Sequence, residues 1–559
     1  MNQLKKCREN LHILFILILN SNLSISQINP NHNHNPNPNH NHNPNPNPNQ
    51  VIFDQNSFPN IHQTGFLGPS SIGKEPSLIY SAHQPQLEDH YPILNPHLNS
   101  TYHLDINFND FKPIKSWGNL SPFHSLHPTN FGIKFAPFVP TGCSIDQVHL
   151  LHRHGARYPT SDSSTTKFAK LIQSAKANQT FKAHHQLAFL NDWSYQLGTE
   201  ILTPFGRSQM FQLGVSYRQK YGFLLSNLTS QFNQSSSINQ KKLVFRTTSQ
   251  DRMYHSAINF AAGFFGLPSE SKYHQLITIE QDGYNNSLAA YYACPNSKLP
   301  QFIKAGRKAA QKFQKTSLSL AQSRLNSIVS GLQFTTDDIY AMQQICAYET
   351  VAFGKSDFCN LFDQQEWKDF EYSNALEFWY SSSFGSPHMS AAIGAGWSEE
   401  LLARLTKTQP TIAQSSINIT LNSNPITFPI DQPIYVDATH DTILSAVFVT
   451  LNLTSLAKSG PLPTSHRPQT QSYIVSQTTP FGAQLSAQVL SCPDRSSKSS
   501  SSLQKYIRFI LNDAIVPLDG MRGCEKDDTF GVCRLDSFTE GLKSRLKEID
   551  YQKICFGKV

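Results

Sequence analysis

Two short apolar segments of this chain each run directly into a charged motif, although almost three hundred residues separate them. Residues 147–151 lead into Arg153-His154-Gly155, and residues 433–436 lead into a stretch that ends in His440-Asp441. Both segments have the length and composition of buried β-strands. Open α/β sheets bind their ligands at the carboxyl ends of the strands. The pattern therefore predicts an α/β fold with both motifs at the ligand-binding edge of the sheet.

A third strand is predicted at residues 243–248, with Arg246 towards its end. Ser249 follows in a position to cap a helix that runs from Asp251 to about Phe265. Further helical patterns, interrupted by glycine and proline, occupy residues 302–332 and 367–405. We therefore expect a mostly helical insertion in the α/β domain.

Residues 153–159 read Arg-His-Gly-Ala-Arg-Tyr-Pro, which places His154 between two arginines. The guanidinium groups of Arg153 and Arg157 offer fixed pairs of donors that suit a phosphoryl dianion. A neutral imidazole between them can attack phosphorus in line and form a phosphohistidine, which water then hydrolyses. Gly155 is expected to let the backbone approach the phosphate closely. The block therefore indicates phosphate chemistry.

The downstream residues supply the remaining requirements of a phosphate displacement. Arg246 and His440 are expected to bind phosphate oxygens together with the two arginines of the block. Asp441 is expected to protonate the leaving oxygen, a role worth roughly 10² to 10⁴ in rate. An isolated Arg-His or His-Asp pair is usually a surface feature, but the block, its place after a strand and the downstream pair together favour catalysis.

Residues 1–26 read as a signal peptide, because a basic start precedes an apolar stretch at 11–19 that is too short to span a bilayer. The alternative is a buried N-terminal helix. A signal peptide predicts a secreted, extracellular protein, which could also be held in a cell wall, without stable membrane insertion.

Residues 27–112 form a segment rich in asparagine, proline and histidine. Within it, residues 29–50 contain no large apolar side chain, so burial cannot offset the entropy of ordering and we expect disorder followed by a linker. A metal-chelating tail is the alternative, with the candidate ligands His32, His34, His40 and His42.

Eight cysteines remain once the signal peptide, with Cys7, is removed: Cys143, Cys294, Cys346, Cys359, Cys492, Cys524, Cys533 and Cys555. An even number in an oxidising compartment fits four disulfides, for which 105 connectivities are possible. A zinc site at Cys524 and Cys533 is the alternative, although their spacing is wide. Eight glycosylation sequons, at Asn99, Asn119, Asn178, Asn227, Asn233, Asn285, Asn418 and Asn452, agree with a secreted glycoprotein.

The 559-residue chain is 39% hydrophobic and 15% charged, which is typical of a globular protein. Its formal charge is +7, but its 46 basic residues are spread along the whole chain and no run of five or more occurs, so the charge does not favour a nucleic-acid partner. A small anionic phosphate ester is the expected partner of a monomeric protein.

The residues from Arg153 to Thr160 resemble the signature of the histidine acid phosphatases, and His440-Asp441 resembles the proton-donor motif of that family. The resemblance extends from about Trp117 to the C-terminus. It also includes the segments 202–206, 246–252, 399–406 and 512–514 and the residue Pro517.

This resemblance implies an α/β domain within residues 113–559 that carries a smaller, mostly helical inserted domain, roughly within 185–240 and 295–425. It implies His154 as the nucleophile and Asp441 as the proton donor, without metal or organic cofactor. The implied phosphate-binding residues are Arg153, Arg157, Arg246 and His440.

Within the family, the chain is most similar to secreted fungal phytases of the 3-phytase type. Ala156 stands where many broad-specificity acid phosphatases of the family have glutamate, which would repel a hexaphosphate. The resemblance implies the disulfides Cys143–Cys492, Cys294–Cys555, Cys346–Cys359 and Cys524–Cys533.

Two departures from the phytase pattern predict a pocket rim that is less basic than in those enzymes. Residues 161–166 contain no lysine and precede Lys167 and Lys170, where a lysine-rich stretch is expected. Residues 377–380 read Glu-Phe-Trp-Tyr where a lysine is expected. A broad-specificity acid phosphatase is therefore the first alternative to a phytase, and a non-catalytic wall or metal-binding glycoprotein is the second.

Overall fold

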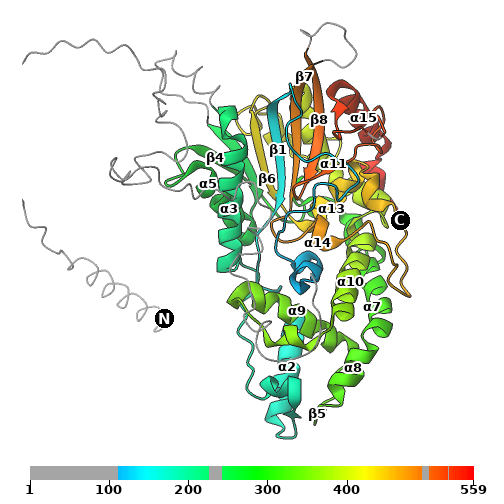
Figure 1. Ribbon diagram of the computed structural model, residues 1–559. Coiled ribbons are helices and arrows are strands. Elements are labelled where there is room, and N and C mark those ends of the chain that lie inside the picture. The colour runs from blue at the N-terminus through cyan, green and yellow to red at the C-terminus, as the bar shows by residue number, and fades with distance from the viewer. Residues whose placement is uncertain (1–110, 226–241, 494–502, 527, 559) are drawn as a thin grey trace, which may run out of the picture. The chain divides into compact units, whose positions relative to one another are not determined.

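The structure is a computed structural model that describes residues 111–225, 242–493, 503–526 and 528–558 (Figure 1). The predicted signal peptide, the histidines of the tail, nearly all of the segment 27–112 and the sequons at Asn99, Asn227 and Asn233 lie outside the described residues. Among the described residues, no helix has the length and apolar character needed to cross a membrane.

Within the described ranges, one eight-stranded sheet has the strand order β10-β8-β7-β1-β6-β3-β4, with β9 paired to β8, and a small sheet pairs β2 with β5. The strands β1, β6, β3 and β4 are parallel to one another, whereas β7 pairs antiparallel with both β1 and β8. The strands are β1 (Ser144–Arg153), β2 (Lys182–Ala183), β3 (Leu243–Thr248), β4 (Tyr273–Thr278), β5 (Val329–Ser330), β6 (Ile434–Thr439), β7 (Gln484–Pro493), β8 (Leu503–Leu511), β9 (Ala514–Val516) and β10 (Cys533–Arg534).

Helices cover both faces of the large sheet, and α3 and α5 lie on the opposite side from α11, α13 and α15 (Figure 1). The α-helices are α2 (Ser164–Ala177), α3 (Pro204–Tyr221), α5 (Asp251–Phe265), α6 (Pro300–Ile303), α7 (Ala305–Ser317), α8 (Ser319–Asn326), α9 (Thr336–Phe353), α10 (Gln364–Ser382), α11 (Pro387–Thr406), α12 (Ile419–Asn422), α13 (Asp441–Thr450), α14 (Val475–Thr478), α15 (Leu535–Glu548) and α16 (Tyr551–Phe556).

The alternation of side chains along β1 explains the two covered faces. Val148 and Leu150 belong to the apolar cluster that contains Phe260 of α5, whereas Leu151 belongs to the cluster that contains Leu444 of α13. Successive strand residues point to opposite faces, so a strand with helices on both sides must be apolar almost throughout. This requirement accounts for the short apolar run that identifies the strand in the sequence.

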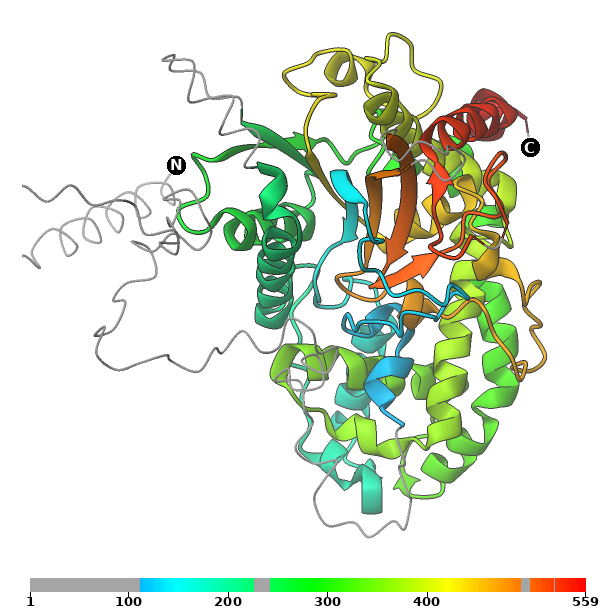
Figure 2. The same cartoon turned by 45° about the horizontal axis from the view of Figure 1, so that its top comes forward.

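A separate group of helices, α2, α7, α8, α9 and α10, lies together beyond the carboxyl ends of the parallel strands (Figures 1 and 2). Part of this group has its own apolar cluster, which includes Phe168 of α2, Leu325 of α8 and Ile345 of α9. The expected insertion boundaries differ from this arrangement, because α3 lies within 185–240 but packs against α5 on the sheet. The helix α3 lies on the sheet because its residues Met210 and Leu213 belong to the apolar cluster that also contains Val148 of β1.

The predicted α/β fold is confirmed, and the strand and helix at β3 and α5 have the predicted bounds. Strands β1 and β6 are longer than predicted. The predicted cap of α5 is wrong, because Gln250 is the N-cap residue and the Ser249 hydroxyl instead accepts a hydrogen bond from the Glu280 N–H, at 2.9 Å.

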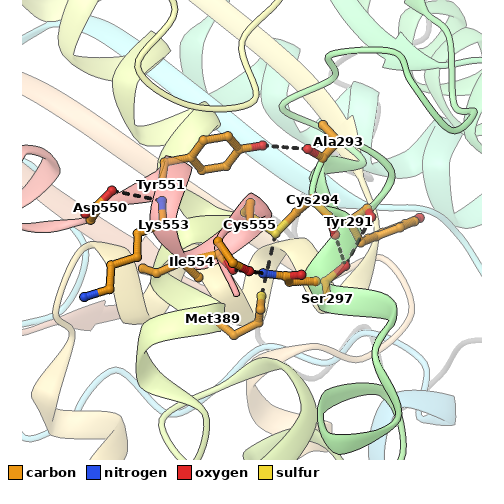
Figure 3. Close-up of a disulfide and its surroundings, with 12 residues drawn as sticks. Tyr291, Ala293, Cys294, Ser297, Met389, Asp550, Tyr551, Lys553, Ile554 and Cys555 are labelled. Atoms are coloured by element: carbon orange, nitrogen blue, oxygen red, sulfur yellow. Dashed lines mark hydrogen bonds between the residues drawn. A yellow bond between two sulfur atoms is a disulfide. The ribbon is translucent and has the colours of Figure 1, made fainter. Parts of the chain in front are cut away.

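The four disulfides that the family resemblance implies are the four that the structure contains. The pairing of Cys524 with Cys533 contradicts the alternative zinc site at these residues. Figure 3 shows the disulfide Cys294–Cys555, which links α16 to the segment before α6. The Tyr551 hydroxyl of α16 also donates a hydrogen bond to the carbonyl of Ala293 in that segment, at 3.0 Å. The C-terminal helix is thus held to a segment that precedes α6.

The segment 202–206 fixes the loop that follows β1. The Thr203 hydroxyl caps α3 by accepting from the Gly206 N–H at 3.0 Å, and the Thr203 N–H donates to the Ala156 carbonyl at 3.0 Å. A Cβ atom on Gly155 would lie 2.2 Å from the Gly206 oxygen, and one on Gly206 would lie 1.9 Å from the Ala156 oxygen. Gly155 therefore permits close approach of protein backbone, rather than of the phosphate that the sequence suggested.

We expect Gly206→Ala to destabilise the fold, because the new methyl group would meet backbone that cannot move aside as a flexible side chain can. The expected loss in the free energy of unfolding is about 1–3 kcal/mol or more, measured by urea denaturation. Gly222→Ala is a suitable control, because its Cβ would meet only the flexible side chain of Arg218. Equal stability of the Gly206 variant and the parent would contradict this account of the loop.

Candidate active site

The candidate site lies where the parallel strands end. The register pairs Arg153, the last residue of β1, with Thr439, the last residue of β6. His154 and His440 therefore leave neighbouring strands at the same level, and their ring centroids are 5.8 Å apart. The structure thus brings the two predicted motifs together, in a buried position.

The hydrogen bond of His154 determines its tautomer. Its Nδ1 atom lies 2.8 Å from the carbonyl oxygen of Gly155. A carbonyl can only accept, so Nδ1 carries the hydrogen and Nε2 keeps a free lone pair. Burial lowers the pKa of His154 well below 6.5, and the positive charges of Arg153, Arg252 and Arg157 lower it further. The imidazole is therefore neutral and nucleophilic even in mildly acidic solution.

Asp441 is held by two neighbours. Its Oδ2 atom lies 2.6 Å from Nη2 of Arg153 and accepts from Nδ2 of Asn119 at 3.1 Å. Burial by itself would raise the pKa of Asp441, but Arg153, Asn119 and other neighbours together lower it. The side chain of Arg153 also donates to the carbonyls of Asn119 and Thr479. Asp441 is thus a carboxylate that takes up a proton only in acidic solution or when these contacts change.

Arg157 and Arg252 extend the positive surface around His154. Nη1 of Arg157 donates to the Tyr158 carbonyl at 2.8 Å, and Nη1 of Arg252 donates to Oε2 of Glu200 at 2.6 Å. Burial lowers the pKa of Arg252, and the charge of Arg157 lowers it further. The buried Nε groups of Arg153, Arg157 and Arg252 have no hydrogen-bond partner among the described residues. Such unpaired donors are costly in a folded protein, and an anion would satisfy them.

His440 is oriented by Glu280, which follows β4 in the sequence. Nε2 of His440 lies 3.0 Å from Oε2 of Glu280, whose carboxylate also accepts from the hydroxyls of Thr248 and Tyr291. Burial alone would raise the pKa of Glu280, but the hydrogen bonds of His440, Thr248 and Tyr291 lower it. An ionised carboxylate only accepts, so Nε2 of His440 carries a hydrogen. A phosphate could then be bound only through Nδ1, and only when both nitrogens are protonated.

Arg246 is not part of this cluster. Its Nε donates to Oδ1 of Asp437 at 2.7 Å, and its two terminal nitrogens donate to the two oxygens of Glu400, each at 2.7 Å. The register explains this position, because Arg246 is paired with Asp437, before the end of β6. The guanidinium group is saturated by carboxylates, so the expectation that Arg246 binds phosphate is corrected here. Its role is structural, within a buried network that also contains Arg404.

A cleft of about 360 Å³ opens beside Arg157. Its lining residues are Arg157, Thr160, Asp162, Ser163, Ser164, Lys167, Arg307, Gln344, Tyr348 and Glu377. Both segments in which the sequence departs from the phytase pattern therefore contribute to one cleft. Lys167 and Arg307 supply its outer cations, and Asp162 and Glu377 supply carboxylates of opposite charge. The rim is thus mixed in charge rather than strongly basic.

Ala156 does not line this cleft. Its side chain is completely buried, and its N–H donates to Oε1 of Gln209 at 2.9 Å. A glutamate at this position would point into protein rather than towards a substrate. The prediction that Ala156 favours phytate by removing a charge from the pocket is therefore wrong.

Sequence reasoning missed four residues of the site: Asn119, Arg252, Glu280 and Arg307. Arg252 and Glu280 carried a usable signal, because each lies just after a parallel strand, as His154 and His440 do. Asn119 was identified only as a glycosylation sequon, and Arg307 comes from α7, which no local pattern connects with the sheet.

Comparison with known proteins gives one consistent family. The profile described as "Histidine phosphatase superfamily (branch 2)" matches residues 144–512. Phytase A of Aspergillus oryzae is 30% identical over 469 residues, which cover 81% of this chain and 93% of that protein. Phytase A of Aspergillus fumigatus is 31% identical, with 76% and 87% covered. The crystal structure of the phytase from D. castellii has the same fold, with a TM-score of 0.64 at 24% identity, covering 83% of this chain and 92% of that one.

The positions of the two arginines predict opposite effects of substitution. Arg252→Ala should lower kcat/KM for p-nitrophenyl phosphate by roughly 10²- to 10³-fold with little change in stability. Arg246→Ala should instead cost about 3–5 kcal/mol in the free energy of unfolding, because it leaves buried carboxylates without their partner. Steady-state kinetics and urea denaturation of the two variants distinguish these effects. A stable Arg246 variant without turnover, beside an active Arg252 variant, would reverse the assignment.

Proposed function

The chain belongs to the histidine phosphatase superfamily (branch 2), and we propose that it hydrolyses phytate to lower inositol phosphates and phosphate through a covalent phosphohistidine at His154. It is a phosphoric monoester hydrolase of the phytase type. One observation carries the proposed mechanism: the hydrogen bond from Nδ1 of His154 to its own chain leaves Nε2 free beside three guanidinium groups.

In the first step, a phosphate group of the substrate binds among Arg153, Arg157 and Arg252. Their unpaired buried donors support this assignment, and charge neutralisation is the main requirement of phosphoryl transfer. His440 contributes a further donor when it is protonated, with Glu280 fixing the ring. In this proposed set of phosphate-binding residues, Arg252 takes the role that the sequence assigned to Arg246.

Nε2 of His154 then attacks phosphorus, while the bond from phosphorus to the ester oxygen breaks. Asp441 gives its proton to the leaving oxygen, which departs as an alcohol. In the second step, water attacks phosphorus while the bond from phosphorus to Nε2 of His154 breaks, and the carboxylate of Asp441 takes a proton from that water. Inorganic phosphate leaves, and His154 and Asp441 return to their starting states.

Substrate binding and the protonation of Asp441 are coupled in this mechanism. Arg153 lowers the pKa of Asp441 through their contact at 2.6 Å. A phosphate that engages Arg153 weakens this contact and brings negative charge towards the carboxylate. Both changes favour the protonated form of Asp441, which is the form that acts as the acid.

Phytate is the favoured substrate because the curated relatives named above are phytases and because the cleft beside Arg157 carries Lys167 and Arg307 for the remaining phosphates. The carboxylates of Asp162 and Glu377 in the same cleft favour the alternative, a broad-specificity acid phosphatase. We further propose that the protein is secreted, on the basis of the N-terminal sequence and the sequons. We also propose that it is a monomer.

The two lowered pKa values predict an acidic optimum. Activity requires neutral His154, so it falls as pH drops through the pKa of His154, which lies well below 6.5. Activity also requires protonated Asp441, so it falls as pH rises through the lowered pKa of that carboxyl. Asn119→Ala removes a donor to the carboxylate and should move the alkaline limb of kcat/KM upward by up to about one pH unit, while the acid limb stays.

Asn119→Gln is the matched control for this pH profile, because it also removes the sequon but retains an amide donor. An alkaline limb that is identical in the parent and in Asn119→Ala would contradict the proposed coupling of Asn119 to Asp441.

His154→Ala should lower turnover of both phytate and p-nitrophenyl phosphate by roughly 10³-fold or more, because it removes the nucleophile. Retention of activity towards either ester would exclude the mechanism. In the unsubstituted enzyme, kcat/KM for phytate should exceed that for simple esters, and a clear preference for the simple esters would support the broad-specificity alternative.

A further inference from the structure

One stretch of this chain has an excess of basic over acidic residues that the catalytic site only partly uses. Residues 283–336 contain no aspartate or glutamate but seven lysines and arginines, a local excess equal to the formal +7 of the whole protein. Three of these cations have carboxylate partners elsewhere: Lys298 with Asp282, Arg307 with Asp337, and Arg324 with Glu366. The other four are Lys304, Lys308, Lys312 and Lys315.

Lys308, Lys312 and Lys315 lie along one side of α7, and Lys304 is the N-cap residue of this helix. The opposite side of the helix is buried against α10, where Gln314 donates to the Ser373 hydroxyl at 2.6 Å. Lys308, Lys312 and Lys315 are exposed, and none of them forms an ion pair within the part of the chain that the structure describes. Like charges three and four residues apart weaken a helix, so nothing in the fold itself is gained from this row.

The three lysines line a hollow rather than a convex surface. This lysine groove, of about 450 Å³, is formed by Lys308, Gln311, Lys312 and Lys315 of α7 together with Thr336 and Asp337 at the start of α9. Its volume is in the range of small-ligand pockets, roughly 300–1000 Å³.

The lysine groove adjoins the cleft of about 360 Å³ beside Arg157, here called the catalytic cleft. Arg307 lines the cleft, and its guanidinium lies 3.8 Å from the carboxylate of Asp337, which lines the groove. The same guanidinium packs over the ring of Tyr340, which fixes its place between the two hollows. A compact polyanion that approaches the cleft therefore meets a second positive hollow at its border.

We propose that the lysine groove binds a second inositol polyphosphate outside the catalytic cleft. The inference rests on the proposed function, because that function names the class of compact polyanion that reaches this border. The groove is short and open to solvent, and its lysines lie within a few turns of one helix, which suits a compact ligand with closely spaced phosphates better than an extended polymer. Three ammonium groups without carboxylate partners provide the charge that such a ligand requires.

The test is a calorimetric titration of the whole unsubstituted protein with myo-inositol hexakissulfate, which a phosphatase cannot hydrolyse. We expect two equivalents to bind. The variant K308Q/K312Q/K315Q should retain the equivalent in the cleft and bind the other at least about tenfold more weakly. Its turnover of p-nitrophenyl phosphate should be unchanged.

The variant K543Q/K547Q/K553Q is the matched control, because it removes the same charge from exposed lysines of α15 and α16. It should bind both equivalents as the parent does. Binding of a single equivalent by the parent, two unchanged equivalents in the groove variant, or an equal loss in the control would each overturn the proposal. Failure of the proposed function would appear separately, as absent turnover of phosphate esters.

Discussion

The site depends on the parallel pairing of β1 with β6. The register that sets Arg153 opposite Thr439 makes His154 and His440 neighbours, although most of the chain lies between them. Just before this edge, Asp437 of β6 accepts hydrogen bonds from Arg246 of β3, from Arg404 and from Trp397 of α11. Burial would raise the pKa of Asp437, but the two arginines hold it far below its usual range. This network fixes β6 relative to β3 and α11, and so fixes the strand end that carries His440 and Asp441.

The site is held by internal ion pairs that a bound anion would replace. Arg153 is paired with Asp441, and Arg252 is paired with Glu200. These contacts reduce the cost of bringing positive groups together in a buried place. They also leave each guanidinium with an unpaired Nε donor among the described residues. In the proposed mechanism, the ion pair that keeps Arg153 and Asp441 in position also controls when Asp441 holds a proton.

Much of the fold and of the central site could be predicted from the sequence, because the signals there are local. A short apolar run followed by a charged motif identified both β1 and β6, and the proposed nucleophile and the proposed acid follow directly from those motifs. Arg246 and Arg252 show where local reasoning fails. Both lie near the end of β3, and only the pairing register reveals that the first is level with Asp437, inside the sheet. Register depends on tertiary packing, which a single strand pattern does not encode.

The central claim is that His154 becomes covalently phosphorylated during turnover. It is tested most directly by rapid-quench trapping of the enzyme with phytate at acidic pH, followed by mapping of the phosphorylated peptide under conditions that preserve phosphohistidine. The account predicts a burst of phosphoenzyme, with the phosphoryl group on Nε2 of His154, because Nδ1 donates its hydrogen to the Gly155 carbonyl. Steady turnover without any phosphoenzyme, or a phosphoryl group on another residue, would contradict it.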